Sequence, residues 1–306
     1  MSANWSRREF LGGAGAVALG AALAGCRSRS TDGESASRGP SSRDVGPSDA
    51  NSPESTPASA APANSASADA VSQGFVSGWG DLVGRFVFDG KAPERAKLVV
   101  DKDVECCGKF DIRDESLMVS ADGGVANVYV YLRSRGAPIC PELEATVPAR
   151  VLLDNRDCIF MPHCLKLWYP KQELYIVNSD PVAQNVAFSP LGDAPANIVL
   201  PVGADATYRF TRPQSVPVPI ACNYHPWESA YVLPRDNPYA DISANDGRFL
   251  IPKLPVGRWE FQLWHERCGF LETPDWPKGR LSVTIRPGQN DLGTFRLEPA
   301  ILAKRS

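Results

Sequence analysis

Short β-branched and aromatic runs, separated by turn dipeptides, make up most of the chain from residue 79 onward. Turn residues occur at Asp89-Gly90, Asp246-Gly247 and Pro287-Gly288, and no window of 11 or more residues carries a helical stripe. The chain also contains 27 prolines and 25 glycines, which suits many short strands and turns. The sequence therefore predicts an all-β fold. The expected strands lie at 82–88, 126–132, 150–153, 174–177, 197–202, 207–210, 216–221, 248–251, 259–264 and 281–285.

The N-terminus has the composition of an export signal. Ser6-Arg7-Arg8-Glu9-Phe10-Leu11 precedes a Gly/Ala-rich run that ends at Leu23-Ala24-Gly25-Cys26. The arginine pair resembles a twin-arginine signal, and Leu-Ala-Gly-Cys resembles a lipobox. These resemblances imply a lipoprotein signal at 1–26, with Cys26 lipidated and the protein anchored in the cell envelope, on its periplasmic or outer face. A transmembrane anchor is disfavoured, because a span needs about 18 or more apolar residues.

Residues 27–76 are dominated by Ser, Ala, Pro, Asp and Gly. Such a segment cannot bury enough apolar surface to offset the entropy of ordering it, so it is expected to be a disordered linker.

Net charge is −3, and no basic stripe alternates with aromatic residues, so nucleic acid is not expected as a partner. The chain has no nucleophile elbow, paired-carboxylate motif or zinc-type His pair, so it is not expected to be an enzyme.

Two turn motifs near the C-terminus indicate a small β-sandwich. Asn245-Asp246-Gly247-Arg248-Phe249-Leu250-Ile251 is followed by Leu254-Pro255-Val256-Gly257-Arg258-Trp259, and this resembles carboxypeptidase-regulatory-like, transthyretin-type sandwiches. Gly84 to Pro93 supplies the opening strand and turn of such a module far upstream. We expect this sandwich at 77–144 and 236–299, with another domain at 145–235 inserted into it. Two modules in tandem are the alternative arrangement.

Cys222-Asn223-Tyr224-His225-Pro226-Trp227-Glu228 is the most informative segment for function. Blue-copper proteins take a Cys, a His and a weak axial Met from one loop, and a second His from a distant strand. The spacing here resembles the amicyanin type of cupredoxin. Upstream, Phe160-Met161-Pro162, the run from Glu173 to Asp180, and Asn185-Val186 match the same family in order. The resemblance implies a cupredoxin-like Greek-key sandwich over 145–235.

Two of the four ligand positions differ from the family. Gln184 stands where the resemblance places a His, and Glu228 stands where it places the Met. A carboxylate in place of a thioether favours Cu(II) and lowers the potential. Three readings stay open: a type 1 copper site, an altered copper site with Cys222, His225, Glu228 and Gln184, or a metal-free sandwich. His163 and His265 are possible extra ligands, although a lone His is more often not a ligand.

The eight cysteines include Cys26 for lipid, which leaves an odd number for pairing inside the folded part. The resemblance to cupredoxin-like envelope proteins implies a Cys107–Cys158 disulfide.

The sequence is compatible with two classes of function. The first is a lipid-anchored copper-binding or electron-transfer protein with an envelope redox partner. The second is a metal-free β-sandwich that binds a structural partner in the envelope.

Overall fold

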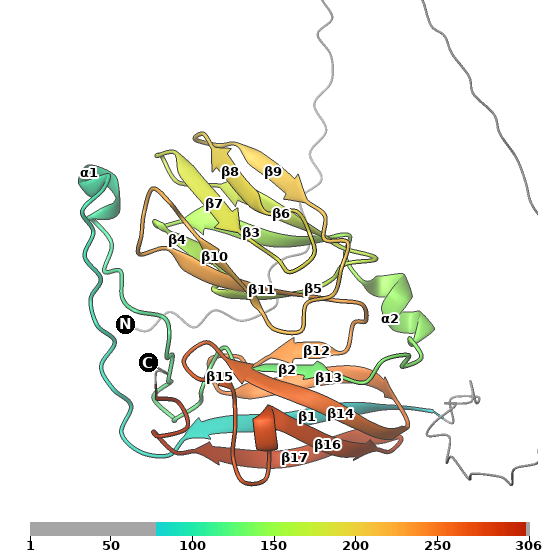
Figure 1. Cartoon of the computed structure of the whole chain (residues 1–306). Coiled ribbons are helices and arrows are strands. Elements are labelled where there is room, and N and C mark those ends of the chain that lie inside the picture. The colour runs from blue at the N-terminus through green and yellow to red at the C-terminus, as the bar shows by residue number, and fades with distance from the viewer. Residues whose placement is uncertain (1–77, 304–306) are drawn as a thin grey trace, which may run out of the picture. The chain divides into compact units, whose positions relative to one another are not determined.

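The computed structural model describes residues 78–303, and nearly all of their regular secondary structure is β-strand, so the predicted all-β class is confirmed (Figure 1). The predicted lipoprotein signal, which includes Cys26, and the predicted linker lie outside these residues. The described strands are β1 Trp79–Phe88, β2 Tyr129–Leu132, β3 Arg150–Arg156, β4 Ile159–Met161, β5 Cys164–Trp168, β6 Glu173–Asn178, β7 Gln184–Phe188, β8 Ala196–Leu200, β9 Asp205–Tyr208, β10 Val218–Ala221, β11 Ser229–Arg235, β12 Ala240–Ile242, β13 Arg248–Pro255, β14 Gly257–His265, β15 Gly269–Phe270, β16 Arg280–Ile285 and β17 Gly288–Leu297. The described helical pieces are α1 Val104–Cys107, α2 Pro141–Thr146 and the 3-10 turn η1 Pro277–Gly279.

One pair of sheets combines strands from the two ends of the described residues. Its first sheet has the order β13-β1-β17, and its second has the order β12-β2-β14-β15, with β16 also paired to β14. Alternate residues of β1 are buried, as expected for a strand with one face on a core. Leu82 and Phe86 of β1 share that core with Phe261 of β14 and Ile285 of β16. The predicted domain boundaries remain predictions.

The other pair of sheets is built from residues between 150 and 235. Its sheets have the orders β5-β11-β10-β7-β8 and β4-β3-β6-β9. Leu153, Ile176, Val186 and Ile220 are almost fully buried in its core. Strand β10 is antiparallel to both β7 and β11. This pairing matters for the site, because it sets the start of β7 beside the loop that joins β10 to β11.

Two tyrosines of β2 connect the two pairs of sheets. The Tyr129 hydroxyl donates to the carbonyl of Tyr231 over 2.9 Å, and the Tyr131 hydroxyl donates to the carbonyl of Ser215 over 2.7 Å. Burial raises the pKa of Tyr131 far above its usual range, so the hydroxyl remains a donor. Apolar side chains pack around them, including Leu233 and Trp264. The contact is therefore a packed and hydrogen-bonded junction.

The segment between β1 and β2 carries α1 and is fastened to the turn between β3 and β4. A disulfide joins Cys107 of α1 to Cys158, with the two Cα atoms 5.5 Å apart. Asp157 and Cys158 both have positive φ (59° and 56°), as a two-residue type I′ hairpin requires. The Cys158 amide donates to the Asp180 carboxylate over 3.2 Å. The turn thus has a fixed conformation against which α1 packs.

No helix in the described part of the chain is both long enough and apolar enough to cross a membrane.

Candidate metal centre

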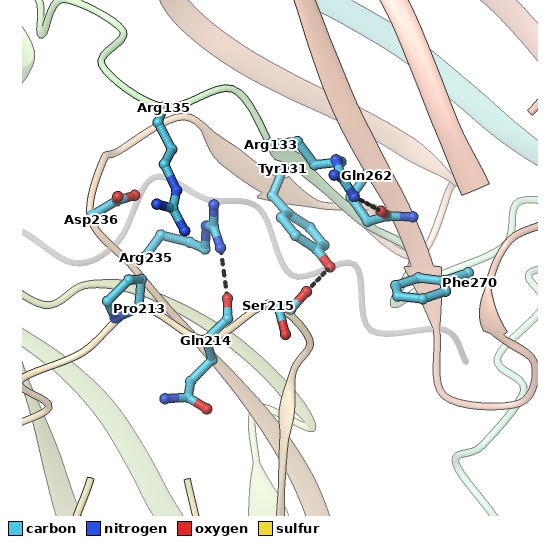
Figure 2. A pocket seen from close by; sticks show the side chains of 10 residues that line it. All are labelled: Tyr131, Arg133, Arg135, Pro213, Gln214, Ser215, Arg235, Asp236, Gln262 and Phe270. Atoms are coloured by element: carbon cyan, nitrogen blue, oxygen red, sulfur yellow. Dashed lines mark hydrogen bonds between the residues drawn. The ribbon is translucent and has the colours of Figure 1, made fainter. Parts of the chain in front are cut away.

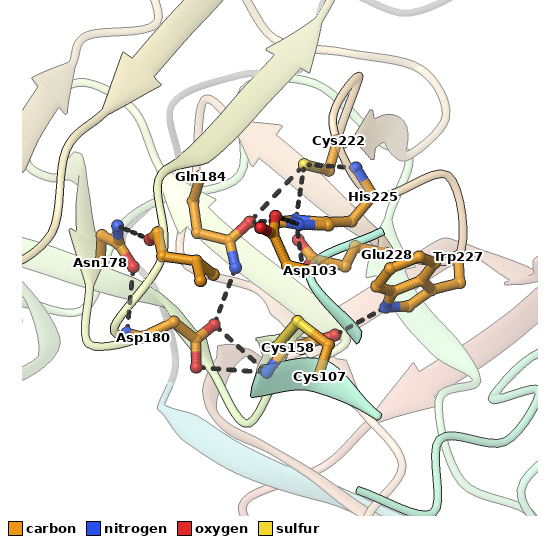
Figure 3. Close-up of a disulfide and its surroundings, with 11 residues drawn as sticks. Asp103, Cys107, Cys158, Asn178, Asp180, Gln184, Cys222, His225, Trp227 and Glu228 are labelled. Atoms are coloured by element: carbon orange, nitrogen blue, oxygen red, sulfur yellow. Dashed lines mark hydrogen bonds and ion pairs between the residues drawn. A yellow bond between two sulfur atoms is a disulfide. The ribbon is translucent and has the colours of Figure 1, made fainter. Parts of the chain in front are cut away.

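The candidate site lies in the loop between β10 and β11. Cys222 follows the last residue of β10, and the Cys222 amide donates to the carbonyl of Glu228 over 3.3 Å, which closes the loop. The Glu228 amide donates to the His225 carbonyl over 2.9 Å, forming a turn at its tip. The Trp227 indole nitrogen donates to the Cys158 carbonyl over 3.0 Å. These bonds bring the side chains of Cys222, His225 and Glu228 to one side of the loop (Figure 3).

Four potential ligand atoms meet at this point. The Cys222 Sγ atom lies 3.7 Å from His225 Nδ1 and 3.7 Å from Gln184 Oε1. His225 Nδ1 lies 2.8 Å from Gln184 Oε1 and 3.4 Å from Glu228 Oε1. Cys222, His225 and Glu228 offer ligand atoms that all lie within 4.8 Å of one another. All four predicted site residues are thus brought together, although Gln184 lies in β7 and precedes the loop by nearly forty positions.

Glu228 is the member of this group whose side chain lacks hydrogen bonds. Its side chain is 0% exposed, and neither carboxyl oxygen has a hydrogen-bond partner. Burial raises the pKa of Glu228, and the neighbouring His225 and Cys222 offset part of that rise. A buried carboxylate without hydrogen bonds is costly, and such groups are normally paired or bound to a metal. The ionised form of Glu228 is therefore stabilised by a positive charge close to it, either an imidazolium at His225, whose Nδ1 lies 3.4 Å away, or a metal ion.

Both nitrogens of His225 face hydrogen-bond acceptors. Nδ1 faces Gln184 Oε1, Glu228 and Cys222, and Nε2 lies 2.8 Å from Asp103 Oδ2. Burial lowers the pKa of His225, but the carboxylates of Glu228 and Asp103 outweigh burial and raise it. With acceptors at both nitrogens, the ring is stable either as imidazolium or with a metal ion at Nδ1. With a metal ion at Nδ1, Asp103 would orient His225 through its contact with Nε2.

Gln184 is held in one orientation by Asp180. Its amide nitrogen donates to Asp180 Oδ2 over 2.8 Å, so its oxygen points toward Cys222 and His225. Asp180 also accepts the Cys158 amide, and its own amide donates to Asn178 Oδ1. A single chain of bonds therefore links the Cys158 turn to the candidate ligands. The sequence indicated Asp180 only as the end of the family-like run from Glu173, without a role at the site, and did not point to Asp103, because neither falls in the Cys-x-x-His motif.

The donor set fits a copper ion. Metal–ligand bonds of about 2.0–2.3 Å in a tetrahedral site separate neighbouring ligand atoms by roughly 3.3–3.8 Å. The Cys222–His225 and His225–Glu228 separations, 3.7 and 3.4 Å, match this range. Gln184 Oε1, 2.8 Å from Nδ1, is at hydrogen-bond distance instead. Thiolate and imidazole both suit copper. Burial and the nearby Glu228 raise the pKa of Cys222 to about 11, and a bound cation reverses that effect by stabilising the thiolate.

His163 and His265 are placed elsewhere. His163 Nε2 lies 2.6 Å from Glu266 Oε1, and Nδ1 lies 3.6 Å from Glu115 Oε2. His265 is fully buried, and its Nδ1 accepts the Arg267 amide. Burial lowers the pKa of His265 to about 4, so its ring is neutral. Neither histidine belongs to the group formed by Cys222, His225 and Glu228.

The His163 ion pairs predict a pH-dependent stability. Burial lowers the pKa of His163, but Glu266 and Glu115 outweigh burial and raise it. A raised pKa in the folded state means that the pairing stabilises the fold fully below the unfolded value of about 6.5 and is lost as pH rises through the folded value. His163→Gln should therefore lower the free energy of unfolding by roughly 2 kcal/mol at pH 6 and by less at pH 9. Urea unfolding with a chelator present measures this difference. An equal loss at both pH values would contradict it.

The Cys107–Cys158 disulfide is present, so this predicted pair is confirmed. Cys222 is among the free cysteines of the described residues, along with Cys106, Cys140 and Cys164.

A separate cavity of about 250 Å³ lies near the Tyr131–Ser215 contact (Figure 2). Three guanidinium groups line it, from Arg133, Arg135 and Arg235, and Arg235 donates to the Gln214 carbonyl over 2.6 Å. Its lining includes none of the four candidate ligands.

No protein-family model and no curated protein matches this chain. Similar solved structures are variants of amicyanin. Two of these in the Cu(I) form are 14% and 16% identical and cover 35% of this chain and 98% of amicyanin, with a TM-score of 0.25. The copper-containing nitrite reductase of Thermus scotoductus SA-01 is 17% identical over 33% of this chain and 24% of its own, also with a TM-score of 0.25.

Proposed function

We propose that the β10–β11 loop binds a copper ion and that the protein is a non-enzymatic, cupredoxin-like copper protein. The observation that supports this proposal is the Glu228 carboxyl group, which is buried and without a hydrogen bond beside a thiol and an imidazole. The Cys222 thiolate, His225 Nδ1 and the Glu228 carboxylate would hold a cation at this point, and its charge would offset that of Glu228. It thereby satisfies three groups at once.

The residues have distinct roles in this proposal. Cys222 and His225 are the strong ligands, and Glu228 is an anionic ligand in the place of a weak thioether. Gln184, held by Asp180, offers an amide oxygen. Bound copper supplies one-electron redox chemistry. The ligands determine the reduction potential and the spectrum of the site. A carboxylate favours Cu(II), so we expect a reduction potential that is low for a cupredoxin and no intense blue absorption band.

The test is metal analysis of the purified protein after exposure to one equivalent of Cu(II) and gel filtration. Wild type is expected to keep about one copper per chain, with sulfur-to-copper charge-transfer absorption of modest intensity. Cys222→Ala should abolish both signals. The matched control is Cys164→Ala, which removes another buried free thiol from the same pair of sheets and should leave copper binding unchanged.

Two outcomes would reject the copper proposal: a folded wild type that retains no copper, or a Cys222→Ala variant that retains as much as wild type.

A metal-free module is the second candidate, and one observation favours it. Doubly protonated His225 can donate to Gln184 and Asp103 while its charge faces Glu228, so the group is compatible with a proton instead of a metal. Under that reading the loop is a packing element, and the sandwich binds an envelope partner.

The location of the protein is proposed from the sequence. The arginine pair and Cys26 support an exported lipoprotein tethered to a membrane, with an envelope redox protein as the expected partner of a copper site. These residues lie outside the described part of the chain.

A further inference from the structure

Three sulfur atoms gather beside the candidate metal centre. Cys107 and Cys158 form the disulfide, and the Cys106 sulfur lies within 4.8 Å of both bonded sulfurs. Cys107 and Cys158 are 0% exposed, whereas Cys106 is partly exposed and carries a free thiol. A thiol in this position next to a disulfide has the components for thiol–disulfide exchange.

The disulfide fastens together the groups that support the candidate ligands. On one side, α1 follows Asp103, whose carboxylate lies 2.8 Å from His225 Nε2. On the other side, the Cys158 carbonyl accepts the Trp227 indole, and the Cys158 amide donates to Asp180. Figure 3 shows these contacts around the bonded sulfurs. A change of disulfide partner is therefore transmitted to the loop.

We propose that Cys106, Cys107 and Cys158 form a thiol–disulfide exchange site in which Cys106 can replace Cys107 as the partner of Cys158. The Cys106 thiol loses its proton, and its sulfur attacks Cys158 Sγ. The Cys107–Cys158 bond breaks, and Cys107 leaves as a thiolate that takes up a proton. One disulfide and one thiol exist before and after, so no external oxidant or reductant is needed.

Geometry selects Cys158 as the sulfur attacked. A disulfide between Cys106 and Cys107 would join neighbours whose Cα atoms are about 3.8 Å apart. Disulfides usually need Cα separations of at least about 4.4 Å. The observed Cys107–Cys158 separation of 5.5 Å meets that requirement, and a Cys106–Cys158 bond can meet it after a local rotation of α1.

The exchange has a definite structural consequence. Successive residues of an α-helix differ by about 100° around its axis, so bonding Cys106 in place of Cys107 rotates α1 against the Cys158 turn. Asp103 immediately precedes α1, and its carbonyl accepts the Cys106 and Cys107 amides. The rotation therefore carries Asp103 away from His225 Nε2. The two disulfide isomers differ in whether His225 keeps its carboxylate partner.

The surroundings of Cys106 keep the exchange slow near neutral pH. Burial raises the pKa of the Cys106 thiol, the carboxylates of Asp180 and Asp103 raise it further, and Lys109 offsets part of the rise. Because the thiolate is the attacking species, the Cys107–Cys158 isomer persists at neutral pH. The exchange involves these three sulfur atoms alone and does not depend on copper binding.

The test uses the full chain, with a chelator present, incubated at pH 7 and pH 9 without any added thiol. Samples are quenched in acid, pulse-labelled with a maleimide and digested, and fragmentation mass spectrometry locates the label on Cys106 or Cys107. The expected result is label on Cys107 in a fraction of molecules that grows several-fold faster at pH 9 than at pH 7. Cys106→Ser is the matched control and should leave Cys107 unlabelled throughout.

A second variant tests the alternative pairing independently of the exchange rate. Cys107→Ser, refolded in air with native circular dichroism, should form a Cys106–Cys158 disulfide. Finding Cys106 and Cys158 both free in that folded variant would overturn the proposal. So would wild type in which the label stays on Cys106 alone at pH 9 over days.

Discussion

Gln184→His combined with Glu228→Met should turn this chain into an intensely blue copper protein. The two changes produce two imidazoles, a thiolate and a weak axial thioether, which is the ligand set of a blue site. Position 184 suits an imidazole, because the Gln184 side-chain oxygen already lies 3.7 Å from Cys222 Sγ, within the range of atoms that share a metal ion. Asp180, which now accepts the Gln184 amide, can accept the outer ring nitrogen of the new histidine.

Absorption and electron paramagnetic resonance spectra of the Cu(II)-loaded double variant measure this outcome. Each single variant is a control: Glu228→Met alone lacks the second imidazole, and Gln184→His alone keeps the carboxylate, so neither should match the double variant in intensity. A folded double variant that binds copper without an intense band, or binds none, would show that the loop does not hold these residues as a cupredoxin does.

Loss of the disulfide should produce the largest change in stability. Cys107 and Cys158 are 51 positions apart, and cross-linking a loop of that length stabilises a fold by about 4 kcal/mol in the chain-entropy model. Cys107→Ala with Cys158→Ala should lower the free energy of unfolding by about that amount. Both positions are fully buried, and alanine introduces no polar group there.

Urea unfolding in non-reducing buffer measures the loss. Cys106→Ala is the matched control, because it removes the neighbouring thiol and leaves the disulfide intact. Wild type treated with a reductant should unfold at the same urea concentration as the double variant. If the double variant and the Cys106→Ala control are equally stable, the cross-link contributes nothing and the chain-entropy estimate does not apply to this segment.

The local sequence was sufficient to predict strands with strong alternation. Strand β1 alternates buried and half-buried residues over its whole length, and most of it was predicted from the sequence, at 82–88. Strand β17 was missed because its sequence is polar and mostly exposed, and its pairing with β1 determines its place. The helices α1 and α2 have four and six residues, too few to show a helical period.

The candidate site was predictable as far as its motif extends. The Cys-x-x-His spacing and the resemblance upstream pointed to Cys222, His225, Glu228 and Gln184, which the fold brings together. The role of Asp103 could not be predicted from the sequence, because Asp103 lies in an irregular segment and contacts His225 across 122 positions. No local pattern encodes such a contact, since it depends on where the disulfide anchors α1.

The pairing of β1 with β17 bears on the order of events during biosynthesis. These strands are parallel neighbours, and the Asn290 side chain donates to the Asp81 carbonyl across 209 positions. Contacts this distant in sequence form late, because a long loop must close first. A ribosome must therefore have released β17 before the sheet around β1 can be completed. If export follows the twin-arginine route, which accepts folded proteins, translocation has to come after synthesis of these strands and cannot accompany it.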